Sequence, residues 1–137
     1  MNNTNQILEI LKLKNIAVIG ASNKKERPSY FVSQYMLKHG YKIIPVNPLH
    51  KKINNTTCYP NLDTIKTTID TVNIFRKSEY VLPIVTSAIK NGVKAIWMQD
   101  GVINYKAKKL AKNAGLLVVM DNCILRQHHL NIKNLKL

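Results

Sequence analysis

Two short segments of the chain combine residue types that bind phosphate groups. The first precedes a helical pattern and reads Gly20-Ala21-Ser22-Asn23-Lys24-Lys25-Glu26-Arg27-Pro28-Ser29. Gly20 permits a tight turn and a close backbone approach to a ligand. The helix expected to begin at Pro28 would point its free N–H groups and its positive dipole end back at this segment. A phosphate-binding loop is predicted, with an ordinary strand-to-helix turn as the alternative, since the spacing does not match G-x-G-x-x-G.

The second segment reads Asn47-Pro48-Leu49-His50-Lys51-Lys52, and no acidic residue lies between Glu26 and Asp63. An NAD site needs an Asp or Glu in this region to hold the ribose diol. A cationic loop suits a ribose that carries a phosphate, as in NADP at the 2′-oxygen or coenzyme A at the 3′-oxygen. A solvated basic loop is the alternative.

Two further polar residues follow predicted strands. Arg76 can clamp a phosphate through two hydrogen bonds, or else pair with Glu79 at the surface. Gln99 at a strand end is expected to contact a ligand, whereas Trp97 is expected to lie in the core.

The sequence contains no recognisable reaction centre. Cys123 precedes His128 and His129, but their spacing matches no known ligand pattern. Cys58 precedes a turn, without a predicted helix N-terminus that would lower its pKa. We therefore predict no catalytic and no metal-binding residue, and leave an acyl-transfer role for Cys123 as an open alternative.

The elements that must position these residues alternate between strands and helices. Strands are expected at 15–20, 41–46, 70–75, 95–98 and 116–120, and helices at 4–12, 28–39, 79–91 and 104–114, with a weak helix near 62–68. All-apolar strands separated by helices indicate a parallel sheet covered on both faces. The predicted fold is α/β: a Rossmann-like, doubly wound, five-stranded parallel sheet in three α/β/α layers, with strand order 3-2-1-4-5.

Composition limits the remaining possibilities. With 137 residues we expect a single domain over 1–137, with a core at 5–125 and a polar tail, or one more short helix, at 126–137. The net charge of +14 comes from 21 Lys and Arg against 7 Asp and Glu. These cations are spread along the chain, without the basic stripe typical of a nucleic-acid binder, which makes nucleic acid an unlikely partner. Without an export signal or a membrane-length apolar stretch, we expect a cytoplasmic protein with free thiols.

Several motifs, taken together, resemble the small single-domain coenzyme A-binding proteins. These are similar to the N-terminal coenzyme A-binding domain of the succinyl-coenzyme A synthetase α subunit. The resemblance covers about residues 5–129 and departs from the family pattern at Ile53-Asn54-Asn55, where an Ile-Gly pair is usual. The motifs that carry it are Val18-Ile19-Gly20-Ala21-Ser22, Arg27-Pro28-Ser29, Gly40-Tyr41, Pro45-Val46-Asn47-Pro48, Asp70-Thr71-Val72-Asn73-Ile74-Phe75-Arg76, Trp97-Met98-Gln99-Asp100-Gly101 and Val119-Met120-Asp121-Asn122-Cys123.

This resemblance implies a ligand and a set of binding residues. The turn Gly20-Ala21-Ser22 would hold the pyrophosphate with Arg27 and Ser29. The pair Asn47-Pro48 and the three basic residues His50, Lys51 and Lys52 would lie by the adenosine and its 3′-phosphate. The adenine and the pantetheine arm would follow Phe75, Arg76 and Gln99. We expect binding of coenzyme A or an acyl-coenzyme A without catalysis, with a partner enzyme subunit or a homodimer as candidate assemblies. A small NADP-dependent oxidoreductase and a basic nucleic-acid-binding protein are the alternatives.

Overall fold

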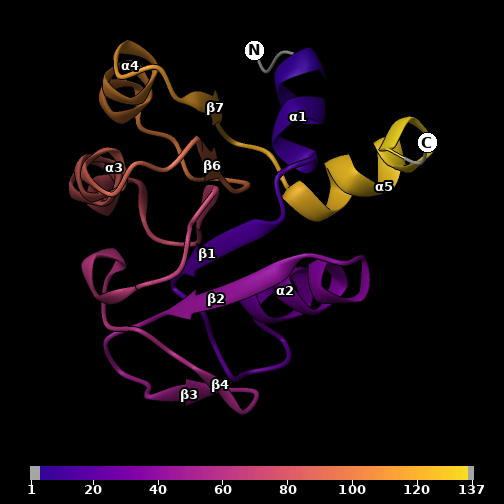
Figure 1. Ribbon diagram of the computed structural model, residues 1–137, viewed down its shortest axis with the longest axis vertical. Coiled ribbons are helices and arrows are strands. Elements are labelled where there is room, and N and C mark those ends of the chain that lie inside the picture. Colours follow the sequence, from indigo (N-terminus) through magenta and orange to yellow (C-terminus); the bar gives the residue numbers. More distant parts are fainter. Residues whose placement is uncertain (1–3, 136–137) are drawn as a thin grey trace.

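A five-stranded parallel sheet forms the centre of the computed structural model, which describes residues 4–135 (Figure 1). The strands lie in the order β2-β1-β5-β6-β7. Their bounds are β1 Asn15–Ile19, β2 Lys42–Val46, β5 Thr71–Ile74, β6 Ala95–Met98 and β7 Leu117–Val119. The predicted parallel α/β sheet is confirmed.

Helices cover both faces of this sheet. One face carries α1 (Thr4–Leu11), α2 (Pro28–Lys38) and α5 (Ile124–Leu135), and the other carries α3 (Val81–Lys90) and α4 (Tyr105–Asn113) (Figure 1). Two 3₁₀ turns, η1 (Leu62–Thr64) and η2 (Ser78–Tyr80), complete the helical segments. Of the weak helix expected near 62–68, only η1 forms.

Alternation along the strands builds two separate cores. In β1, Ile16 and Val18 pack with α1, α2 and α5, whereas Ala17 and Ile19 pack with α3 and α4. Successive side chains of a strand point to opposite faces, so an all-apolar strand supplies both cores at once.

The predicted strand order, 3-2-1-4-5, is wrong. In the same numbering the observed order is 2-1-3-4-5, because β5 pairs with β1 and leaves β2 at the edge. Tyr59 occupies the outer side of β2, where its N–H donates to Pro45 O (3.0 Å) and its carbonyl accepts from Asn47 N (2.9 Å). Pro45 was the overlooked signal, because a strand that contains proline lacks one ladder donor and is confined to sheet edges.

A two-stranded hairpin, which sequence reasoning missed, follows β2. It joins β3 (Lys52–Ile53) to β4 (Thr56–Thr57) and lies beside β2 (Figure 1). Asn54 and Asn55 form its turn with φ of 51° and 62°, a conformation that asparagine tolerates better than most residues. Paired asparagines therefore close the turn in the left-handed conformation.

The segment expected to be a polar tail or one more short helix lies mostly within α5, which packs against α1 and α2. Its buried residues are Ile124 and His128. Within residues 4–135, none of the helices has both the length and the apolar character needed to cross a bilayer.

Candidate functional site

A cavity of about 730 Å³ opens at the carboxyl ends of the strands. Loops that follow β1, β2, β5 and β6 form its walls, together with the residue that precedes α5. Ligands of open α/β sheets bind at this edge, where neighbouring connections diverge to opposite faces. The lining residues are Gly20, Ala21, Ser22, Lys24, Arg27, Pro28, Ser29, Phe31, Val32, Asn47, Leu49, His50, Phe75, Arg76, Lys77, Gln99, Asp100, Gly101, Val102 and Cys123.

The observed strand order places this cavity between β1 and β5. A 2-1-3-4-5 sheet reverses its winding between the first and third strands, which are β1 and β5 here. Arg76 follows β5 and so lies at the centre of the sheet beside the first loop, whereas the predicted order 3-2-1-4-5 would have put it at the sheet edge.

Gly20 lies in direct contact with the end of β5. Its φ is +85°, and a Cβ built on it would stand 2.6 Å from Phe75 O and 3.3 Å from the Arg76 side chain. Both the dihedral angle and the close approach therefore require glycine here. The two loops form one continuous wall of the cavity.

The first loop is ordered by its own polar groups. Ser22 Oγ accepts a hydrogen bond from Lys24 N (3.0 Å), and Pro28 starts α2 without an N–H. Tyr30 N and Phe31 N both donate to Arg27 O. The missing N–H of Pro28 and the bond from Tyr30 N reduce the number of free N–H groups that this helix N-terminus offers to an anion.

Asn47 joins the first and second loops. Its side-chain Nδ2 donates to Ala21 O (2.9 Å), and its Oδ1 accepts from Leu49 N (2.9 Å). The turn made by the second bond directs Leu49 and His50 to the cavity and leaves Pro48 outside the lining. Asn47 thus uses its amide to hold two loops together, and no carboxylate occupies this position.

Arg76 makes no ion pair with Glu79 among residues 4–135, where the ion pairs are Lys94–Asp70 and Arg126–Asp100. Its guanidinium lies 5.0 Å from the ring centroid of Tyr80, a cation–π contact that leaves its N–H groups free to meet a phosphate.

Gln99 is 4% exposed, and its Nε2 donates to Asn73 Oδ1 (2.7 Å). This buried bond fixes the orientation of the amide at the cavity wall. Trp97 is fully buried, as predicted, and its indole N–H donates to Asn122 O (2.9 Å). The core therefore holds the segment that leads into α5.

Charge in the lining is predominantly positive. Lys24, Arg27, His50, Arg76 and Lys77 contribute basic side chains, whereas Asp100 is the one carboxylate of the described lining. Hydrogen bonds from Arg126 to both Asp100 oxygens (2.9 and 2.8 Å) hold the pKa of that carboxyl below its usual value. The cavity thus matches a compact polyanion.

Cys123 lines the cavity as a half-buried free thiol. His128, which follows Cys123 in the chain, is engaged elsewhere, because its Nδ1 lies 2.8 Å from Tyr35 Oη. Residues 4–135 contain no group of three or more His, Cys, Asp or Glu side chains that could hold a metal ion.

Most of the predicted binding residues meet in this one cavity, but Pro48 and Lys52 lie outside its lining. Lys52 begins β3, and its carbonyl accepts from the Asn23 side chain. Lys25 and Lys51 also lie outside. Apolar contributors such as Phe31, Leu49 and Val102 were missed, because nothing in their residue type marks a ligand contact.

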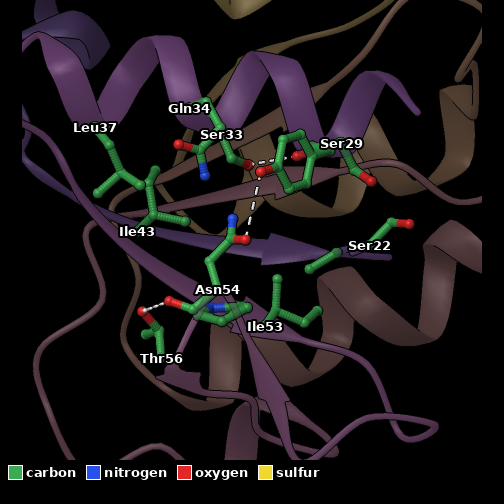
Figure 2. A pocket seen from close by; sticks show the side chains of 12 residues that line it. Ser22, Ser29, Ser33, Gln34, Leu37, Ile43, Ile53, Asn54 and Thr56 are labelled. Carbon is green, nitrogen blue, oxygen red and sulfur yellow. Dashed lines mark hydrogen bonds between the residues drawn. The ribbon is translucent and has the colours of Figure 1, made fainter. Parts of the chain in front are cut away.

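A second, smaller cavity of about 40 Å³ lies behind the first loop, between α2, β2 and the hairpin (Figure 2). Figure 2 shows Leu37 and Ile43 pointing toward it from α2 and β2, opposite Ile53 of the hairpin. Tyr30 Oη donates to Asn54 Oδ1 (3.4 Å) across it. Its size suits water or a small group, so the larger cavity is the candidate site.

A doubly wound sheet with a cationic cavity at its switch point is the architecture typical of domains that bind nucleotide-type ligands. The family model described as "CoA binding domain" matches residues 14–129. The chain therefore belongs to the coenzyme A-binding domain family, and the resemblance read from its motifs is confirmed.

Three individual proteins are similar to this chain over most of its length. Protein YneT of Bacillus subtilis is 37% identical over 124 residues, covering 90% of this chain and 92% of YneT. The ADP-forming acetate–CoA ligase of Methanocaldococcus jannaschii is 28% identical over 128 residues, which cover 87% of this chain but 18% of the ligase. A solved structure of a hypothetical protein from Pyrococcus horikoshii superposes with a TM-score of 0.91 at 38% identity, covering 95% of this chain and 92% of that one.

Proposed function

We propose that this protein binds coenzyme A, free or as an acyl thioester, in the large cavity and acts as a binding module without a reaction of its own. The observation that carries the proposal is the convergence of Lys24, Arg27, His50, Arg76 and Lys77 on one cavity at the switch point. Coenzyme A presents a pyrophosphate and a ribose phosphate, which need several cations within a short span.

The cavity walls suggest how such a ligand would lie. In this proposal the turn at Gly20–Ser22 holds the pyrophosphate with Arg27 and Ser29. Asn47 positions the loop that brings His50 toward the phosphorylated ribose, and Arg76 and Gln99 flank the adenine and the arm. A partner subunit is part of the same proposal, since the M. jannaschii ligase carries the matching region within a much longer chain.

Calorimetric titration with coenzyme A and with NADP⁺ tests the ligand. We expect measurable binding of coenzyme A and weaker binding of NADP⁺. Absence of coenzyme A binding at millimolar concentration would overturn the proposal, and tighter binding of NADP⁺ would favour the oxidoreductase alternative.

Two neighbouring lysines provide a matched pair for the site. Lys24 lines the cavity and Lys25 does not, although both belong to the same loop and carry the same charge. A charge-assisted hydrogen bond contributes about 1.5 kcal/mol, so Lys24→Ala should weaken coenzyme A binding about tenfold. Lys25→Ala should change it less than about twofold. Equal losses would mean that general charge, and not the cavity, attracts the ligand.

A further inference from the structure

A cluster of aromatic and imidazole rings joins α5 to the body of the protein, away from the lining of the cavity. His128 of α5 is 5% exposed and lies 2.8 Å, through Nδ1, from Tyr35 Oη of α2. Its ring centroid is 4.8 Å from that of His39 and 5.6 Å from that of Tyr41. Tyr41 in turn donates to Leu11 O at the end of α1. One imidazole therefore connects three parts of the same face of the sheet.

The charged and titratable groups around His128 are cationic or neutral. His39 faces it from the C-cap of α2, Lys14 from the segment between α1 and β1, and His129 adjoins it on α5. Tyr35 and Tyr41 are neutral phenols, and burial raises the pKa of Tyr41 to about 12. Glu9, the carboxylate of α1, is exposed and takes part in no ion pair within residues 4–135, and β7 has no titratable side chain.

A proton on His128 would therefore add a positive charge without a compensating carboxylate. Burial lowers the pKa of His128 below its ordinary value of 6.5, and His39, Lys14 and His129 lower it further. A histidine with a depressed pKa stabilises the folded arrangement fully above pH 6.5, and that contribution is lost as the pH falls through the lower, folded value.

The same helix carries one wall of the cavity. Cys123 lines the cavity immediately before α5, and Arg126 binds Asp100, another lining residue, through two hydrogen bonds. Arg126 and Gln127 both donate to Asn122 Oδ1. Displacement of α5 would thus move Cys123 and release Asp100.

We propose that His128 is a pH-sensitive joint: its protonation loosens α5 from α2 and opens the cavity wall, so that ligand binding weakens in mild acid. The ligand part of this inference rests on the proposed coenzyme A function. The movement of α5 does not depend on it.

Trp97, the only tryptophan of the chain, reports on the joint because its indole N–H binds Asn122 O beside Cys123. Without ligand, we expect the Trp97 fluorescence to change in a single titration whose midpoint lies below pH 6.5. His129→Gln, on the same helix, should keep this titration, and His128→Phe should abolish it. His39→Gln should move the midpoint to higher pH, because His39 contributes to lowering the pKa of His128.

Binding is then measured over the same pH range with coenzyme A as the probe. The affinity of the parent protein should fall, relative to that of His128→Phe, by up to tenfold for each pH unit below the Trp97 midpoint. The ligand's own phosphate titration is common to both proteins and cancels. A flat Trp97 signal, or a midpoint that survives in His128→Phe, would overturn the switch. If Trp97 titrates as expected but the protein binds no coenzyme A at any pH, the proposed function is overturned and the movement of α5 is not.

Discussion

Replacement of Gly20 by alanine tests the contact on which the cavity is built. Gly20 has φ of +85°, and a Cβ at this position would lie 2.6 Å from the backbone oxygen of Phe75. Gly40 has nearly the same dihedral angle, +88°, but its Cβ would meet nothing within 4 Å. Gly20→Ala and Gly40→Ala therefore impose the same backbone strain, and only the first adds a collision.

The expected magnitudes follow from these two terms. A left-handed alanine costs about 1–2 kcal/mol, so Gly40→Ala should lose about that much stability. Relief of the collision requires β1 and β5 to separate, because the opposing atom is backbone. That movement adds about 1–3 kcal/mol, a range typical of overpacking, and brings Gly20→Ala to roughly 2–5 kcal/mol.

Urea unfolding followed by Trp97 fluorescence measures both variants, and calorimetric titration measures their affinity for coenzyme A. Gly20→Ala should also lose affinity, since the collision displaces Phe75 and Arg76 from the first loop, whereas Gly40→Ala should bind as the parent protein does. Equal stability losses in the two variants would refute the close approach as the reason for glycine at position 20.

Two further results are expected. A thiol reagent should modify half-buried Cys123 well before Cys58, because Cys58 is buried and burial raises the pKa of its thiol. Coenzyme A should slow the modification of Cys123 and leave that of Cys58 unchanged. Mass spectrometry of the labelled peptides measures both rates, and equal rates would contradict the assigned exposures. Arg126→Ala should cost no more than about 1 kcal/mol in urea unfolding, because Arg126 and Asp100 are both about half exposed, and a larger loss would mean that the pair anchors α5.

Local sequence patterns predicted most helices and strands because the formation of each element depends mainly on residues that are close in the sequence. As expected, α2 begins at Pro28 and ends before Gly40. The apolar runs form strands whose alternate side chains pack into the two cores. The hairpin was not predicted because its strands are two residues long, which is too short for a periodic pattern. The pair Asn54-Asn55 was the one local feature that indicated its turn.

The candidate site was predicted in part for a related reason. Polar residues directly after strands, such as Arg76 and Gln99, converge because parallel strands end at a common edge. Lys52 and Pro48 lie outside the cavity lining because their positions depend on how the loop folds, through the turn at Asn47 and the start of β3.

The fold class, the family and the residues that follow each strand could all be read from the sequence. Local rules of propensity, periodicity and turn chemistry were sufficient for them. Which strands lie side by side could not be read from the sequence. The three-dimensional arrangement decides that Gly20 contacts Phe75 and that Arg76 lies at the centre of the sheet. The same arrangement brings His128 against Tyr35 across 93 positions of the chain. Such pairings depend on which surfaces bury each other best over the whole chain. Apart from Pro45, which confines β2 to a sheet edge, the pattern within one segment does not specify its partner.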